Sequence, residues 1–429
     1  MVDLRRLIAI NALIRVASAA TGQIIAFIVA AQLADRLGAA AGAVLVGILA
    51  ASFYVTELLV APIAGRVADR RGQLKVLRWG PAVGAVSAVA AAAVSFGHWP
   101  VVALAGGLLV ARVLEGLSAA FAVPTTLALL ATGTEKSDAS RLRVMGAFEV
   151  ASLVGLIGGY VGAGVMWDAL GASALLVFAG VYAFAWLLVP TWREVTSAQH
   201  RVLPLRETLT TLATTPGVPA FIIAWLAVNA VVGVWAQQAP FLMKLPVRSA
   251  SQALVGGYSG TNIGYVFGVW AAVFLVGIAL WSLFAAQWPR RRTLLVALCG
   301  MLTVVIALAL VNHGVTHWLL ALGMVGVLVE SGFTPAAFAH MADITDVGDA
   351  SRGMTMGIYS MLLGTGQLAG AVLGAPLAAA LQMDGVLMAT AGLALVAMIA
   401  VGRMPQSIVG RPASEPGRAQ GQPEQTTLP

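Results

Sequence analysis

The sequence predicts an all-α integral membrane protein in which twelve transmembrane helices form two pseudo-symmetric six-helix bundles. Three observations predict this class: the composition is strongly apolar, apolar segments of spanning length recur, and one short motif occurs twice. Hydrophobic residues make up 59% of the 429 residues and charged residues only 10%, whereas soluble globular chains have about 25% charged residues. Such a composition indicates that lipid is the surrounding solvent.

Apolar segments long enough to span a bilayer recur along the chain. A spanning helix needs about 20 mostly apolar residues, and such segments begin near residues 7, 42, 76, 102, 145, 172, 218, 263, 294, 318, 355 and 384. A longer polar stretch separates the first six segments from the last six. We therefore expect a first bundle at 1–190, a linker at 191–217, a second bundle at 218–403 and a disordered tail at 404–429, which is rich in Pro, Gly and Gln.

The repeated motif indicates that the two halves are copies of one unit. Residues Asp138–Gly146 return 211 positions later as Asp349–Gly357, and six of the nine residues are identical. Both copies precede a long, Gly-rich apolar segment, in which glycines four residues apart predict close helix packing. A duplicated membrane bundle is typical of secondary transporters.

The positive charges predict the orientation of the chain. With both termini inside, 20 of the 25 Lys and Arg residues fall in inner segments and three in outer loops, while Arg15 and Arg112 fall inside helices. This asymmetry is typical of a multi-pass protein of the plasma membrane whose termini, linker and tail are cytoplasmic. It also explains the net charge of +7 without a nucleic-acid partner.

Signatures of enzymes are missing from the sequence. It contains no His-Glu-x-x-His, no Gly-x-Ser-x-Gly and no Walker-type loop, so we expect neither catalysis nor a cofactor. His340, Asp343, Asp346 and Asp349 follow the tenth segment and have the side chains of a metal site. A solvated helix end explains them better, and we expect no metal.

The strongest local motif is Gly65-Arg66-Val67-Ala68-Asp69-Arg70-Arg71-Gly72-Gln73-Leu74-Lys75, on the expected inner loop between the second and third helices. Its glycines permit a tight turn, and Asp69 can accept hydrogen bonds from a helix N-terminus. The segment resembles the loop signature of the major facilitator superfamily, Gly-x-x-x-Asp-Arg-x-Gly followed by basic residues, although Gln73 and Leu74 replace the first of these. We assign Gly65, Asp69, Arg70 and Gly72 to a gating loop.

This resemblance covers residues 5–403 and is closest to proton-coupled, drug-efflux-like members. It implies the superfamily's fold, in which two six-helix bundles rock about a central site that opens to one side at a time.

Several charged residues fall inside the predicted helices, where a central charge costs about 3 kcal/mol even on insertion scales. They are Arg15, Glu57, Arg112, Glu115, Glu149 and Glu330. Arg15 and Glu57 both lie about 13 Å from the inner face at about 1.5 Å per residue, so we predict that they pair. The pair either only holds the first two helices together or takes part in coupling. Asn11 shares the helical stripe of Arg15, and we assign it to the cavity.

Arg112 and Glu115 are three residues apart and therefore neighbours on one helix face. The run Leu109–Gly116 resembles the fourth-helix signature of the superfamily, whose Arg is implicated in coupling in proton-driven members. The alternative is a fixed structural pair.

Glu330 has no basic residue inside the second bundle to pair with, so we expect it to carry a proton or bind a cationic substrate. The alternative is a protonated Glu that is hydrogen-bonded to a neighbouring helix. Asn229 and Trp235 are assigned to the same cavity, and for Trp235 ordinary helix packing is the alternative.

The sequence thus predicts a secondary active transporter that moves a small organic solute by alternating access, coupled to protons and functional as a monomer. The excess of carboxylates inside the membrane favours efflux of an apolar or cationic compound. Drug:proton antiporters of the superfamily usually carry a Gly-Pro signature in the fifth helix, and no proline lies between Gly146 and Gly164. The alternatives are a proton symporter that imports a metabolite and a non-transporting sensor of the same fold.

Overall fold

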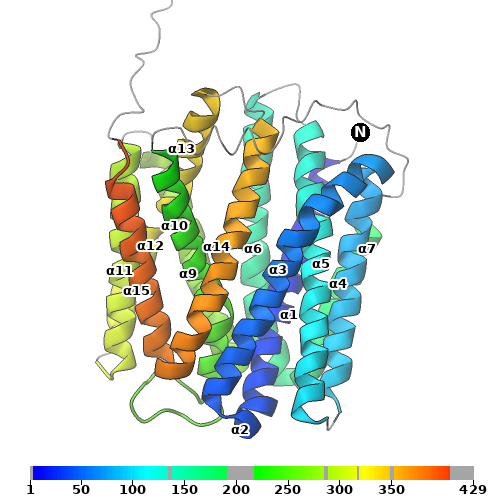
Figure 1. Cartoon of the computed structure of the whole chain (residues 1–429), viewed down its shortest axis with the longest axis vertical. Coiled ribbons are helices and arrows are strands. Elements are labelled where there is room, and N and C mark those ends of the chain that lie inside the picture. Colours follow the sequence, from blue (N-terminus) through cyan, green and yellow to red (C-terminus); the bar gives the residue numbers. More distant parts are fainter. Residues whose placement is uncertain are drawn as a thin grey trace, which may run out of the picture.

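A computed structural model describes residues 3–97, 99–133, 138–190, 217–284, 288–315, 318–347 and 352–405. In these ranges the chain is helical, and the long helices run side by side (Figure 1). The start of α1 (Leu4–Ile28) and the end of α15 (Met383–Gly402) lie at the same end of the molecule, called here the terminus-bearing end. The linker at 191–216 and the tail from 406 lie outside the described residues.

The first half of the chain forms six spans. Its first span continues from α1 through a π-helical turn (Val29–Leu33) into α2 (Ala34–Leu37). The other helices are α3 (Ala39–Arg71), α4 (Gln73–Ser95), α5 (Val101–Gly133), α6 (Asp138–Leu170) and α7 (Ala174–Leu188). A 3-10 turn at Gly171–Ser173 separates α6 from α7, where Gly171 has a φ of +57° that favours glycine.

The second half of the chain forms six spans as well. Its helices are α9 (Val218–Lys244), α10 (Gly260–Phe284), α11 (Arg290–Asn312), α12 (Leu319–Glu330), α13 (Phe333–Val347), α14 (Arg352–Leu381) and α15. In the described residues, 11 segments are apolar and long enough to cross a membrane; one of them, Gly146–Leu188, contains most of α6 and all of α7. With α12 and α13 as one interrupted span, the predicted twelve are confirmed.

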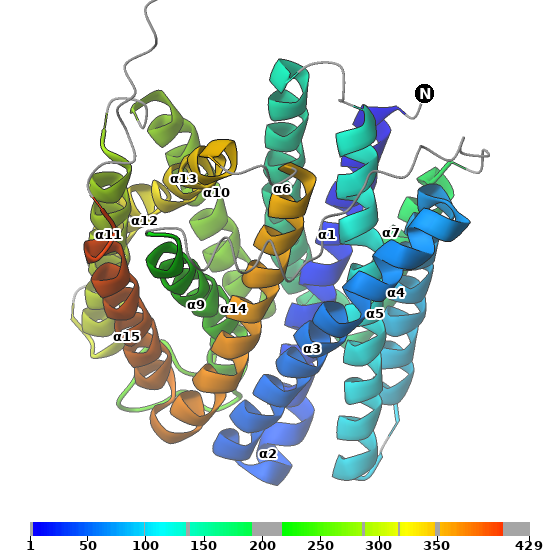
Figure 2. The ribbon, with the colours of Figure 1, turned by 45° about the horizontal axis from the view of Figure 1, so that its top comes forward.

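Two helix pairs join the halves, and they are related by symmetry. The second span, α3, packs along α14, the eleventh, and the fifth span, α6, packs along α10, the eighth (Figure 2). When the first six spans are superposed on the last six, the second span falls on the eighth and the fifth falls on the eleventh. The α3–α14 and α6–α10 contacts are therefore equivalent under this symmetry, as the predicted doubled bundle requires.

Glycines make these contacts close. A Cβ added to Gly164 of α6 would overlap the carbonyl oxygen of Gly260 in α10, and one added to Gly47 of α3 would overlap Ala375 of α14. Along α14, Gly366 and Gly370 similarly admit the backbone of α9. The packing role predicted for the Gly-rich fifth and eleventh segments is confirmed.

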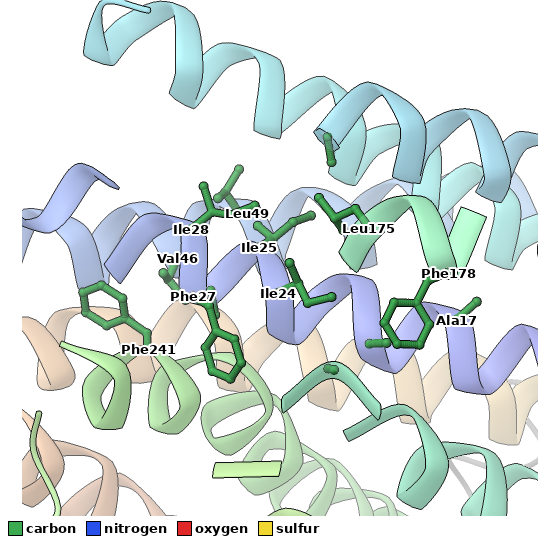
Figure 3. Close-up of a cluster of buried hydrophobic side chains, with 14 of the residues drawn as sticks. Ala17, Ile24, Ile25, Phe27, Ile28, Val46, Leu49, Leu175, Phe178 and Phe241 are labelled. Carbon is green, nitrogen blue, oxygen red and sulfur yellow. The ribbon is translucent and has the colours of Figure 1, made fainter. Parts of the chain in front are cut away.

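The core is densest around α1, between the two halves. Ile24, Ile25 and Phe27 of α1 are at most 1% exposed. They pack in one buried cluster with side chains of α3 and α7, and with Phe241 of α9 from the other half (Figure 3). This apolar plug closes the end of the molecule opposite the terminus-bearing end.

The halves separate toward the terminus-bearing end. Val150 and Val154 occupy the same face of α6 as Val161 and Gly164, which pack on α10. Yet Val150 is 47% and Val154 51% exposed. Figures 1 and 2 show α3 and α14 diverging in the same direction. The molecule is therefore closed at one end and open at the other.

The gating loop is shorter than predicted. Helix α3 continues through Arg71, so Gly65 is helical, and a Cβ added there would meet nothing within 4 Å. Gly72 alone, with a φ of +94°, makes the turn into α4. The expected role of Gly65 in a tight turn is wrong, because the helical hydrogen bonds run past it.

Candidate functional site

The predicted pair Arg112–Glu115 is present in the centre of the first bundle. The Arg112 Nη1 atom lies 2.5 Å from Glu115 Oε2, and the two side chains are 4% and 1% exposed. Glu115 also accepts a hydrogen bond of 2.9 Å from the Ser18 hydroxyl. Arg112 donates from Nε to the carbonyl oxygen of Leu49 at 3.4 Å, and its guanidinium lies 4.6 Å from the centre of the Phe53 ring. The pair thus links α5 to α1 and α3.

A side chain of the second bundle approaches this pair. Gly22 lies one turn after Ser18 on α1. A Cβ added there would lie 2.9 Å from Gln237 Nε2 and 3.4 Å from Arg112 Nη1. Gln237 belongs to α9, so its amide reaches across the interface between the bundles toward the guanidinium. Its neighbour Gln238 donates a 3.0 Å hydrogen bond to the carbonyl oxygen of Ala43 in α3.

Arg15 acts on two carboxylates but forms an ion pair with neither. Among the described residues it forms no ion pair within 4.0 Å, and its Nε makes no hydrogen bond. It is nevertheless near enough to attract both Glu57 of α3 and Glu149 of α6 electrostatically. The predicted contact with Glu57 is therefore absent in this conformation. The physical reason is that α1 is pressed against α6, where a Cβ added to Gly155 would lie 2.8 Å from the Cβ of Arg15.

Aromatic side chains that the sequence analysis missed surround this centre. Tyr54 of α3 is 8% exposed and meets the Phe53 ring at 5.0 Å between centroids. Tyr160 shares a face of α6 with Glu149, three turns earlier, and meets Phe267 of α10 at 5.2 Å. No motif marks these tyrosines, because only the packing of α3 and α6 turns them inward.

Three candidates from the sequence have structural contacts instead. Asn11 donates a buried hydrogen bond of 2.8 Å to the Ser152 hydroxyl and joins α1 to α6. The Trp235 indole donates to Thr390 Oγ1 of α15 at 2.8 Å. Asn229 donates to the carbonyl oxygen of Trp225 in its own helix at 2.9 Å. The structure does not bring Asn229 or Trp235 together with the charges of the first bundle.

Glu330 lies apart from the other charged residues. It is the last residue of α12, before a break at Ser331 and Gly332, and not in mid-helix as expected. It lies on the face of α12 that carries Gly323 and Gly326, and a Cβ added to Gly300 of α11 would lie 2.6 Å from its backbone nitrogen. That face packs on α11. Its assignment to the cavity stays a prediction.

In the gating loop Asp69 was predicted to accept hydrogen bonds from a helix N-terminus, and the end of the tenth span was predicted to be solvated. Asp69 and Arg70 are exposed, and in the described part of the chain no hydrogen bond from a helix N-terminus reaches Asp69. His340 is 4% exposed, because it packs on the Phe221 ring at 4.8 Å, so its predicted solvation is wrong. Asp349 and the side chains of Asp343 and Asp346 lie outside the described residues.

The sequence analysis also missed a polar link between the bundles at the closed end. Asp168, near the end of α6, accepts hydrogen bonds from the backbone nitrogens of Gly260 at 2.8 Å and Thr261 at 2.7 Å. It therefore caps α10 of the other half. Lys244 of α9 lies 3.7 Å from the same carboxylate. The partner helix is 92 residues away, so no local pattern identifies this cap.

Two bundles of six helices, joined by symmetric contacts and opened at one end, are the architecture that the loop motif implies. The family model of the Major Facilitator Superfamily matches residues 12–254 and 252–427. The chain belongs to the Major Facilitator Superfamily. Its fold is that of a transporter, and it is a multi-pass membrane protein.

Solved structures of other members of the superfamily share this fold. A D-xylose–proton symporter superposes with a TM-score of 0.68 at 15% identity, covering 93% of this chain and 97% of its own. The nucleoside transporter NupG gives 0.66 at 12% identity, covering 94% and 98%. The inward-open xylose transporter XylE from E. coli gives 0.66 at 12%, covering 93% and 94%. A search of curated proteins finds no match.

Proposed function

We propose that this superfamily member is a proton-coupled secondary transporter that moves a small organic solute by alternating access. The observation that carries the proposal is a charged centre in a molecule open at one end only. Arg15 attracts both Glu57 and Glu149 there and forms an ion pair with neither. A carboxylate that competes for one cation can change partner or protonation as the cavity reopens, which is what coupling requires.

The open end is the cytoplasmic end in this proposal. The exposed end of α3 at Asp69 and Arg70 lies there, and the excess of Lys and Arg on that side supports cytoplasmic termini and a plasma-membrane location. Gly72 and the basic residues beside it would then form an inner gate. Asp69 would have to meet a helix N-terminus in the conformation closed at this end.

The carboxylates outnumber the arginines at this centre, which supports export of an apolar or cationic solute. Glu57, Glu115 and Glu149 face Arg15 and Arg112, and Tyr54 and Tyr160 supply aromatic faces on which an organic cation can lie. Proton symport with import of a metabolite is the second candidate. It is favoured by the absence of proline between Gly146 and Gly164 and by the likeness to a symporter.

Purified protein in vesicles with an imposed pH gradient tests the proposal. A candidate solute added on one side should move protons in the opposite direction during antiport and in the same direction during symport. Vesicles that contain the Glu57→Gln, Glu149→Gln double variant provide the control, because they keep the protein but lose the two free carboxylates. Solute-dependent proton movement that is the same in both preparations would contradict the assigned role, and no movement with any solute would favour a sensor.

A further inference from the structure

A groove on the outer surface of the first bundle combines an apolar wall with two arginines. It lies between the terminus-bearing half of α3 and the helices α4 and α5, and its volume is about 410 Å³. Pockets of roughly 300–1,000 Å³ accommodate small molecules. The lining includes Val60, Ile63, Val67, Trp79 and Phe121, with Arg70 and Arg71 at the end nearest the membrane surface.

The groove faces the bilayer and not the central interface. Leu58 of α3 points toward α14, where it meets Gly364. Val60 follows two residues later and therefore points about 200° away around the helix. Leu59 is 68% and Ile63 52% exposed, as expected for side chains that contact acyl chains. A ligand in this groove would be reached laterally from the membrane.

The arginines at the end of the groove have no acidic partner in the part of the chain that the structure describes. Within the described residues, neither Arg70 nor Arg71 forms an ion pair within 4.0 Å. The guanidinium of Arg71 lies 5.9 Å from the centre of the Trp79 ring. A planar guanidinium beside an indole at the membrane surface suits a phosphate headgroup, which it binds through two hydrogen bonds.

We propose that this groove binds one anionic phospholipid. An acyl chain lies along Val60, Ile63 and Val67, and the headgroup phosphate lies between Arg70 and Arg71. Because every bilayer lipid offers an acyl chain, selectivity comes from the headgroup charge, to which each nearby arginine contributes. The lipid fastens the terminus-bearing half of α3, which carries Glu57, to α4 and α5.

Native mass spectrometry of the purified full chain, titrated with phosphatidylglycerol or phosphatidylcholine, measures the binding. Wild-type protein should retain phosphatidylglycerol in preference to phosphatidylcholine. The Arg70→Gln, Arg71→Gln double variant should lose about tenfold in affinity for phosphatidylglycerol. The matched control is Arg291→Gln, Arg292→Gln, at the terminus-bearing start of α11, where Arg292 also lies 4.7 Å from a tryptophan ring, that of Trp288. It should bind as the wild type does.

A second variant tests the apolar wall and leaves the charges in place. Val60→Trp fills the groove, so it should weaken the retention of phosphatidylglycerol while both arginines remain. Equal losses in the Arg70/Arg71 variant and the Arg291/Arg292 control would overturn the proposal in favour of nonspecific surface charge. Displacement by glycerol phosphate as effective as that by the intact lipid would also overturn it, because the acyl chain would then contribute nothing.

Discussion

The two bundles share their helices but differ in where their charges lie. In the first bundle Arg15, Glu57, Arg112, Glu115 and Glu149 gather around α1, in the middle of the molecule. The second bundle places Glu330 at a helix break that packs on α11, away from that middle. Both bundles nevertheless supply equivalent glycine contacts to the interface. Duplication has thus kept the packing surface in both halves, whereas the ionic chemistry belongs to one.

The largest expected effect concerns the buried ion pair, which has no counterpart among the described residues of the second bundle. Arg112→Leu leaves Glu115 buried without its cation, at a cost of about 3–5 kcal/mol of folding free energy. The double variant Arg112→Leu, Glu115→Leu should recover most of this, because apolar residues of similar size replace the whole pair. Thermal unfolding in detergent measures both, and a double variant as unstable as the single one would contradict the pairing.

Substitutions at the two symmetry-related contacts, α3–α14 and α6–α10, should shift the conformational equilibrium equally. Gly164→Ala and Gly47→Ala both place a methyl group into the opposing helix, which costs about 1–3 kcal/mol in the conformation closed at that end. Each should shift the population toward the conformation open there, as measured by spin-label distances across the interface after Cys299→Ser. Gly180→Ala is the control, since a Cβ there meets nothing within 4 Å. A population shift in only one of the two glycine variants would contradict the equivalence of the two contacts.

Neutralising the carboxylates of the two bundles should affect transport unequally. Glu57→Gln or Glu149→Gln should lower gradient-driven transport at least about tenfold, corresponding to about 1.4 kcal/mol, because each removes an attraction on Arg15. Glu330→Gln should leave the dependence on the pH gradient unchanged, since it does not face that centre. The measurement is solute flux into vesicles at several imposed pH gradients, compared between these variants and the wild type. If only the Glu330 variant lost its dependence on the pH gradient, proton coupling would have to be assigned to the second bundle.

The smallest expected effect is at the closed end. Asp168→Asn removes the charge that caps α10 and attracts Lys244, which is worth about 0.3–1 kcal/mol at a helix end. The open population at that end should rise by a few-fold in the spin-label measurement. Asp384→Asn serves as its control: Asp384 accepts a 2.8 Å hydrogen bond from Asn312 within the second bundle and does not cross the interface. Equal shifts in both variants would exclude a specific link between the halves.

The sequence predicts those features that depend on spacing along one helix. Apolar length predicts the spans, and a separation of three residues predicts the contact of Arg112 with Glu115. It fails where two helices must be placed relative to each other. The distance from Arg15 to Glu57 depends on how far α1 moves toward α6 at Gly155, and the position of Glu330 depends on the break at Ser331. Depth in the membrane can be counted from a sequence, whereas the rotation of a helix about its axis comes from its neighbours.

The glycine-faced contacts between the bundles have a kinetic consequence. At Gly164, Gly260 and Gly264 the surfaces that must part are bare backbone, so at these three positions no side chains interlock and no rotamers need to rearrange when the halves move. Resistance to the motion then comes from polar links, such as the one between Asp168 and α10, and from the apolar plug in which Phe241 packs against α3. The rate of switching should therefore respond steeply to changes at these polar links and in the apolar plug.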